Sequence, residues 1–145
     1  MRYVKEIHIS LPRDRVIELF DSTENMKKWQ PELVSFEAIS GEPGQEGAQS
    51  RMLYRMGKRE VELVETITVR DFPDKFSGTY EAKGVWNLVE NRFEKTGPQA
   101  TKWTIQTEFK FSGLMMKLMG LLMPGAFKKQ TFTMMMRFKE FAESA

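Results

Sequence analysis

The stretch that decides the fold is residues 101–111, TKWTIQTEFKF. Its large apolar residues fall on alternate positions, with Trp103, Ile105 and Phe109 on one side and mostly polar residues on the other. A repeat of two residues is that of a β-strand, because successive side chains point to opposite faces. One apolar and one polar face are typical of an antiparallel sheet that covers a core on one side only.

The segment that follows, about residues 113–143, predicts a helix. A stripe at spacings of four and three residues consists of Phe127, Thr131, Met134, Phe138 and Phe141. Such a stripe has to lie on an apolar surface. Pro124-Gly125 predicts a kink or an interruption, because proline lacks the backbone N–H that a continuous helix needs.

Strand-like runs also precede residue 101, and they cover residues 33–40, 49–56, 60–70, 76–82 and 85–93. The first ten residues alternate in the same way, with Tyr3, Ile7 and Ile9 on one face. Two short helices are expected next, at about 12–20 and 22–29. The predicted order is therefore one strand, two short helices, about six strands and a long C-terminal helix, which is an α+β arrangement.

The composition excludes several kinds of site. The 145 residues predict a single domain, 1–145, because about 150 residues is a usual domain length. There is no cysteine and only one histidine, His8, on the polar face of the first strand, so no metal or cofactor is expected. The net charge of +2 and the absence of basic, aromatic-rich patches argue against nucleic acid. Because no run of about eighteen apolar residues occurs, we expect a soluble, cytoplasmic protein.

The order of elements and three short motifs resemble the START/birch-pollen-allergen superfamily (SRPBCC), in its bacterial polyketide cyclase/dehydrase-like branch. Residues 9–16 resemble the passage from the first strand into the first helix, and Trp29-Gln30-Pro31 matches a Trp-x-Pro at the end of the second helix. Residues 101–105 resemble the last strand, although Ile105 stands where a tryptophan is often found. The resemblance covers essentially the whole chain.

This resemblance implies a helix-grip fold, in which a curved antiparallel sheet of about seven strands wraps around a long C-terminal helix. It also implies a cavity between the sheet and the helix, which would be mostly apolar with a few polar groups. It indicates function only broadly, because members of the superfamily include lipid carriers, hormone receptors and aromatic cyclases.

Glu65 is the most informative candidate residue. It stands in line with Val61, Leu63, Ile67 and Val69, so alternation points its carboxylate into the predicted cavity. A buried carboxylate has a partner or a raised pKa, and a raised pKa suits general acid–base catalysis. The alternative is a bulge, or a position at the mouth of the cavity, that returns Glu65 to water.

Other candidates come from the sheet and the terminal helix. Tyr54 and Tyr80 each carry a hydroxyl that either orients a ligand or is satisfied within the core. Asn87 stays ambiguous, because apolar residues occupy both faces of its strand, and Trp29 is expected to fix the short helices to the sheet. The predicted ligand-binding set is Met52, Tyr54, Glu65, Ile67, Tyr80, Trp103, Ile105, Met119, Met123, Phe127 and Met134.

Residues 113–123, GLMMKLMGLLM, are apolar almost all the way round, and Lys117 is their only charge. A helix of this kind must be buried on several sides, dimerise or contact lipid. Methionine adapts to variable apolar surroundings, which suits any of these roles. Three interpretations follow: a gate over the cavity mouth, an interface in a homodimer, and a contact with a membrane surface.

Three hypotheses for function remain. The first is a non-enzymatic carrier or sensor that binds an apolar small molecule, such as a lipid, an isoprenoid or a polyketide-like aromatic, with Glu65 as polar anchor. The second is a polyketide cyclase or dehydratase in which Glu65 is the general acid–base. The third is a membrane-surface or partner-binding module that uses residues 113–123.

Overall fold

The computed structural model describes residues 1–145 and contains one seven-stranded sheet. The strands are β1 (Arg2–Ile9), β2 (Leu33–Ser40), β3 (Gln49–Met56), β4 (Arg59–Asp71), β5 (Lys75–Ala82), β6 (Val85–Gly97) and β7 (Ala100–Phe111). Their order in the sheet is β1-β7-β6-β5-β4-β3-β2, and every neighbouring pair is antiparallel. The sheet is therefore a meander whose first strand pairs with its last.

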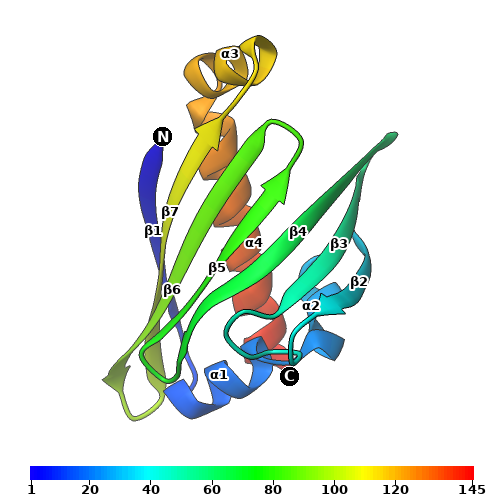
Figure 1. Cartoon of the computed structure of the whole chain (residues 1–145). Coiled ribbons are helices and arrows are strands. Elements are labelled where there is room, and N and C mark those ends of the chain that lie inside the picture. The colour runs from blue at the N-terminus through cyan, green and yellow to red at the C-terminus, as the bar shows by residue number, and fades with distance from the viewer.

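Four helices accompany the sheet: α1 (Arg13–Phe20), α2 (Thr23–Trp29), α3 (Leu114–Leu122) and α4 (Pro124–Ser144). The long helix α4 runs behind the sheet, with α1 and α2 at the end where the chain terminates and α3 at the opposite end (Figure 1). This is the predicted helix-grip fold. No helix of the structure combines the length and the apolar character needed to cross a membrane.

The expected interruption of the C-terminal helical segment is confirmed. α3 ends at Leu122, and Pro124 is the first residue of α4. Proline is well suited to this position, because the first N–H groups of a helix have no partner within it. The methionine between the two helices therefore belongs to neither.

A bulge in β4 changes the expected direction of one side chain. Ile67 pairs with Gly78, but Val69 pairs with Ser77, so β4 contains one extra residue here. The prediction that Val69 continues the face of Ile67 is wrong, because strict alternation assumes that no residue is added. Beyond the bulge, the Arg70 guanidinium donates hydrogen bonds of 2.9 and 2.7 Å to the Asp21 carboxylate at the end of α1.

The packed core lies between the sheet, α1, α2 and the second half of α4. Trp103 and Phe138 are fully buried, with their ring centroids 5.2 Å apart. Trp29 stacks on Phe20 at 6.0 Å and meets Phe138 edge-on at 5.0 Å. Trp29 therefore fixes α2 to this core, as predicted.

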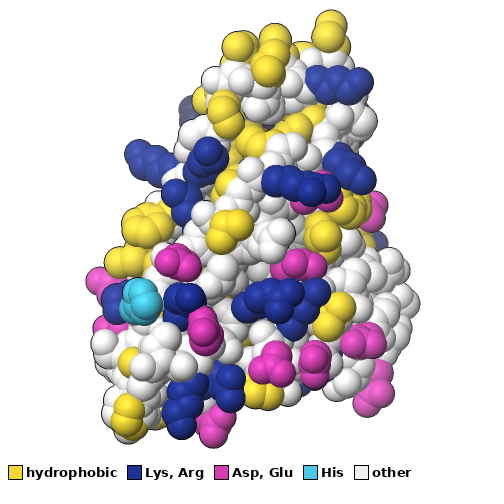
Figure 2. Space-filling view, turned by 90° about the vertical axis from the view of Figure 1, so that its left-hand side faces the viewer, with side chains coloured by type: hydrophobic (Ala, Val, Ile, Leu, Met, Phe, Trp, Pro, Cys, Tyr) yellow, Lys and Arg dark blue, Asp and Glu magenta, His cyan; other side chains and the backbone are white.

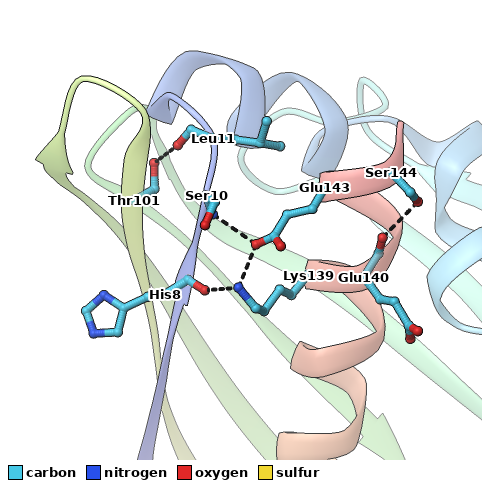
Figure 3. Close-up of polar contacts among 8 residues, drawn as sticks. All are labelled: His8, Ser10, Leu11, Thr101, Lys139, Glu140, Glu143 and Ser144. Carbon is cyan, nitrogen blue, oxygen red and sulfur yellow. Dashed lines mark hydrogen bonds and ion pairs between the residues drawn. The ribbon is translucent and has the colours of Figure 1, made fainter.

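The C-terminal turns of α4 are fastened to the end of β1 (Figure 3). The Glu143 carboxylate accepts hydrogen bonds from the Ser10 N–H at 2.9 Å and from the Lys139 ammonium at 2.6 Å. Lys139 also donates to the backbone oxygen of His8 at 2.7 Å. The imidazole of His8 points away from α4, in agreement with its predicted place on the polar face of β1.

Candidate functional site

A row of mostly polar residues crosses the inner face of the sheet. The pairing of β3 to β7 places five residues side by side: Ser50, Glu65, Tyr80, Asn87 and Phe109. Residues directly opposite each other in neighbouring strands point to the same face. The sheet register therefore concentrates four polar side chains in a surface that is otherwise largely apolar, and we call these five residues the cross-strand row.

Glu65 is the acidic member of the row and is 7% exposed. The bulge in β4 comes after Ile67, so it does not return Glu65 to solvent. The Tyr80 hydroxyl donates a 2.7 Å hydrogen bond to Oε2 of Glu65. Burial raises the pKa of Glu65, and the hydrogen bond from Tyr80 offsets part of that rise.

Tyr54 extends this polar group toward the short helices. Its hydroxyl donates a 2.6 Å hydrogen bond to Oε1 of Gln30, the residue that caps the C-terminal end of α2. Burial raises the pKa of Tyr54, and the negative charges of Glu65 and Glu32 raise it further. Burial also raises the pKa of Tyr80 well above its ordinary value, with the Glu65 charge as the second cause. Both phenols are therefore neutral hydrogen-bond donors at physiological pH.

The strand partners of Asn87 resolve the ambiguity of its strand. It lies opposite Tyr80 in β5 and Phe109 in β7, which places it on the inner face. Its amide nitrogen donates to the Thr107 hydroxyl at 2.7 Å and to the backbone oxygen of Glu108 at 3.0 Å. The side-chain amide is thus held with its oxygen free to accept a hydrogen bond.

The inner face around the cross-strand row is only partly covered by α4. The half-buried residues near the row are Tyr54, Val61, Leu63, Tyr80, Ala82, Val85, Asn87, Val89, Phe109 and Phe111. In the core, by contrast, Trp103, Phe138 and Met135 are 0% exposed. Side chains are therefore fully buried at the α1 end and remain partly accessible at the row.

The sheet also has a surface depression where β4 and β5 separate. The pairing of β4 with β5 ends at Val64 and Glu81, and the strands diverge beyond these residues (Figure 1). A depression of about 430 Å³ lies there, lined by Gln49, Glu62, Leu63, Val64, Thr66, Glu81, Ala82 and Lys83. Leu63 and Ala82 share the inner face with Glu65 and Tyr80, whereas most of the other lining residues point to the outer face, so the depression lies where the strands separate and is mainly on the outer side of the sheet.

The predicted ligand-binding residues fall into three groups. Glu65 and Tyr80 are joined by a hydrogen bond within the cross-strand row, and Tyr54 lies near enough for the charge of Glu65 to raise its pKa. Met52 and Ile67 are buried beside the row, at 2% and 6% exposure.

Trp103 and Ile105 form the second group, within the packed core. Trp103 is about 20 Å along β7 from Phe109, since each strand residue rises about 3.4 Å. Its indole N–H donates to Oδ1 of Asn91 at 3.0 Å, so its polar group is already satisfied.

The third group comes from the helical segment. Phe127 and Met134 are half-buried on α4, and Phe127 packs on Phe109 of the row, with 5.1 Å between ring centroids. Met119 and Met123 are 37% and 52% exposed at the α3 end of the molecule.

Three members of the row, Ser50, Asn87 and Phe109, lie outside the predicted ligand-binding set, and so does Gln30, which accepts from Tyr54. Gln30 follows the last turn of α2, and no repeat in the sequence relates that position to Tyr54 in β3. The sequence pattern does not assign Asn87 to a face, and only its strand partners do so.

Comparison with known proteins agrees with this architecture. The family described as "Polyketide cyclase / dehydrase and lipid transport" matches residues 1–140. No curated protein matches the sequence.

Solved structures share the fold at low sequence identity. The Zhui aromatase/cyclase from Streptomyces sp. R1128 superposes with a TM-score of 0.83 at 11% identity, covering 99% of this chain and 93% of that one. A protein from Thermus thermophilus gives a TM-score of 0.80 at 16% identity, covering 99% and 98% of the two chains. Norcoclaurine synthase from Thalictrum flavum, in complex with dopamine and hydroxybenzaldehyde, gives 0.74 at 14% identity, with 97% and 85% covered. The match over nearly the whole chain, together with this fold, shows that the chain belongs to the polyketide cyclase/dehydrase and lipid transport family of the SRPBCC superfamily.

Proposed function

We propose that the protein binds an apolar small molecule between the sheet and α4, as a carrier or sensor. Lipids, isoprenoids and polyketide-like aromatics are the ligand classes that fit. The observation that carries the proposal is the hydrogen-bonded pair of Tyr80 and Glu65, which places polar oxygen atoms within a half-covered apolar surface. A ligand with an apolar body and one carbonyl or hydroxyl group matches such a surface.

The polar groups have distinct roles in this proposal. The Tyr54 and Tyr80 hydroxyls already donate to Gln30 and Glu65, so each offers a ligand hydroxyl its oxygen as an acceptor, as does the free amide oxygen of Asn87. Phe109 and Phe127 supply apolar contact at the far side of the row. The depression between β4 and β5 is the proposed route by which the ligand reaches the row.

A second candidate is a cyclase or dehydratase in which Glu65 is the general acid–base. Its support is the raised pKa of Glu65, since a carboxyl group works best in proton transfer when its pKa approaches the working pH. Tyr54 or Tyr80 would then turn its hydroxyl from its present acceptor toward a developing enolate oxygen. The similarity in fold to an aromatase/cyclase and to norcoclaurine synthase agrees with this chemistry.

The first experiment is native mass spectrometry of freshly purified protein, beside its mass after denaturation, followed by solvent extraction. An added mass that is lost on denaturation supports the proposal and gives the ligand class. Titration with the apolar fluorophore anilinonaphthalene sulfonate then compares the wild type with Tyr80→Phe and Glu65→Gln. The matched control is Glu60→Gln, an exposed glutamate on the same strand that does not line the depression.

The outcomes separate the hypotheses. A bare polypeptide mass together with no saturable fluorophore binding overturns ligand binding. If the extracted compound is recovered unchanged after incubation with the protein, the carrier function stands. If the compound loses water or cyclises, and the Glu65→Gln variant still binds the compound but no longer converts it, the enzyme hypothesis replaces the carrier hypothesis.

A further inference from the structure

The helix α3 exposes most of its apolar surface. Leu114, Met115, Leu121 and Leu122 are 85%, 79%, 75% and 68% exposed, and Leu118 is 52% exposed. We call these five residues the α3 face. Figure 2 shows hydrophobic side chains gathered at the tip of the molecule, where α3 lies in Figure 1. An exposed apolar cluster of this kind marks a contact surface.

One side of α3 packs on the sheet, and this contact fixes the direction of the α3 face. A Cβ added to Gly120 would lie 2.6 Å from the Phe111 ring, so the helix backbone rests directly on that ring. A Cβ added to Gly84, in the turn between β5 and β6, would lie 2.8 Å from Cγ of Met116. Met116 and Gly120 are one helical turn apart, so a single stripe faces the sheet while the α3 face is turned outward.

Positive charge surrounds this end of the molecule. From residue 109 to residue 139 the sequence contains no Asp or Glu. The exposed lysines near α3 are Lys83, Lys110, Lys117, Lys128 and Lys129, and none of them forms a salt bridge. In Figure 2 the acidic side chains gather mainly in the lower half, away from the apolar tip. The molecule is therefore polarised, with an apolar and cationic end.

We infer that the α3 end docks on an anionic phospholipid surface. An apolar helix face inserts into the boundary between headgroups and acyl chains, while neighbouring lysines contact the acidic headgroups. A second copy of the chain fits this surface less well, because a two-fold interface would bring the same uncompensated lysines face to face. Docking does not depend on the ligand that the cross-strand row binds, so the two proposals fail separately.

The absence of cysteine allows a direct test of insertion. Leu121→Cys is labelled with an environment-sensitive nitrobenzoxadiazole fluorophore and mixed with vesicles of phosphatidylcholine containing phosphatidylglycerol. We expect a blue-shifted, brighter emission that is absent with pure phosphatidylcholine and decreases as salt is added. The matched control is Ile39→Cys, an exposed apolar position on β2.

Sedimentation with the same vesicles tests the residues. Met115→Asp should abolish co-sedimentation while leaving the thermal unfolding midpoint unchanged, because Met115 is 79% exposed. Lys128→Gln/Lys129→Gln should weaken binding about tenfold or more, and the charge-matched control Lys27→Gln/Lys28→Gln on α2 should not. Equal responses of labels at positions 121 and 39, or no co-sedimentation at low salt, overturn the proposal. The proposal is also overturned if the wild type is a dimer that does not bind vesicles and the Met115→Asp variant is a monomer.

Discussion

The Tyr80 hydroxyl donates a 2.7 Å hydrogen bond to the carboxylate of Glu65, and the two residues lie directly opposite each other in β5 and β4. Burial raises the pKa of both groups, which favours the protonated form of each. The hydrogen bond acts in opposite directions on the two residues: it lowers the pKa of the acceptor and raises that of the donor. The pKa of Glu65 therefore lies above its ordinary value, and the hydrogen bond from Tyr80 limits the rise.

The first prediction concerns stability against pH. Because the folded-state pKa of Glu65 lies above its ordinary value of 4.5, the stability contributed by its protonation is full below pH 4.5 and is lost as the pH rises through the folded-state pKa. Glu65→Gln removes this charge and keeps an oxygen that can accept from Tyr80. We expect the variant to be more stable than the wild type at neutral pH by on the order of 1 kcal/mol, and the difference to shrink toward pH 4.5.

Urea unfolding at a series of pH values measures this difference. Glu62→Gln is the control, because its carboxylate is exposed and pairs only with Arg51 at the surface. Its difference from the wild type should not grow between pH 4.5 and neutral pH. A wild type that is more stable than Glu65→Gln at neutral pH contradicts the assigned burial cost.

The second prediction concerns the donor. Tyr80→Phe removes the hydrogen bond that lowers the pKa of Glu65, so that pKa should rise further. The variant should also lose about 1–3 kcal/mol of stability at neutral pH, since a buried carboxylate is left without its donor. Carbon-13 NMR of the glutamate carboxyl groups measures the titration.

Tyr54→Phe serves as the control for this measurement. The Tyr54 hydroxyl donates to Gln30 and not to Glu65, so its removal should change the pKa of Glu65 much less. Equal pKa changes in the two variants would show that the hydrogen bond is not the group that tunes Glu65.

Much of the fold could be predicted from residue pattern. In β7 the alternation of Trp103, Ile105 and Phe109 with polar residues appears in the structure as buried and accessible faces of a single strand. The end of α3 before Pro124 could be predicted because proline acts locally, through its missing N–H. Predictions of this kind succeed where the cause lies within a few residues of its effect.

The candidate site could be predicted only in part. Alternation places Glu65 on the inner face, but the bulge that turns Val69 out of line has no signature in the sequence. Asn87 could not be assigned, because Trp86 and Leu88 are as apolar as its inward neighbours. Gln30 approaches Tyr54 only through the tertiary placement of α2 against β3.

The sequence also does not predict which inward-facing side chains lie in the packed core and which lie on the half-covered surface. The pattern predicts that Trp103 lines a cavity, and the structure surrounds it with aromatic rings, including Phe20, Phe93 and Phe138. Whether a large inward side chain meets a ring or an open space depends on how α1, α2 and α4 close on the sheet. That is a property of the packed molecule and not of the strand.

The third prediction follows from this placement. Trp103 is 0% exposed and donates to Asn91, so Trp103→Phe leaves a void and an unpaired amide oxygen. We expect a loss of about 2–4 kcal/mol in urea unfolding, with fluorophore binding at the cross-strand row unchanged. Trp86→Phe is the control, because Trp86 packs under Lys110 away from the core and should cost less than about 1 kcal/mol. A Trp103→Phe variant of normal stability that no longer binds the fluorophore contradicts the core assignment.

The fourth prediction has the opposite dependence on pH from the first. The Lys139 ammonium and the Ser10 N–H hold the pKa of Glu143 below its ordinary value of 4.5. Its contribution to stability is therefore present above pH 4.5 and is lost as the pH falls through the folded-state pKa. Glu143→Gln should destabilise the protein at neutral pH by less than about 1 kcal/mol, because the pair is partly exposed and screened by solvent. The difference from the wild type should vanish at strongly acidic pH.

Glu140→Gln is the matched control on α4, since that carboxylate points away from β1 (Figure 3). Thermal unfolding at several pH values tests this prediction. If Glu143→Gln remains less stable than the wild type by the same amount in strong acid, packing of the side chain, and not its charge, joins α4 to β1.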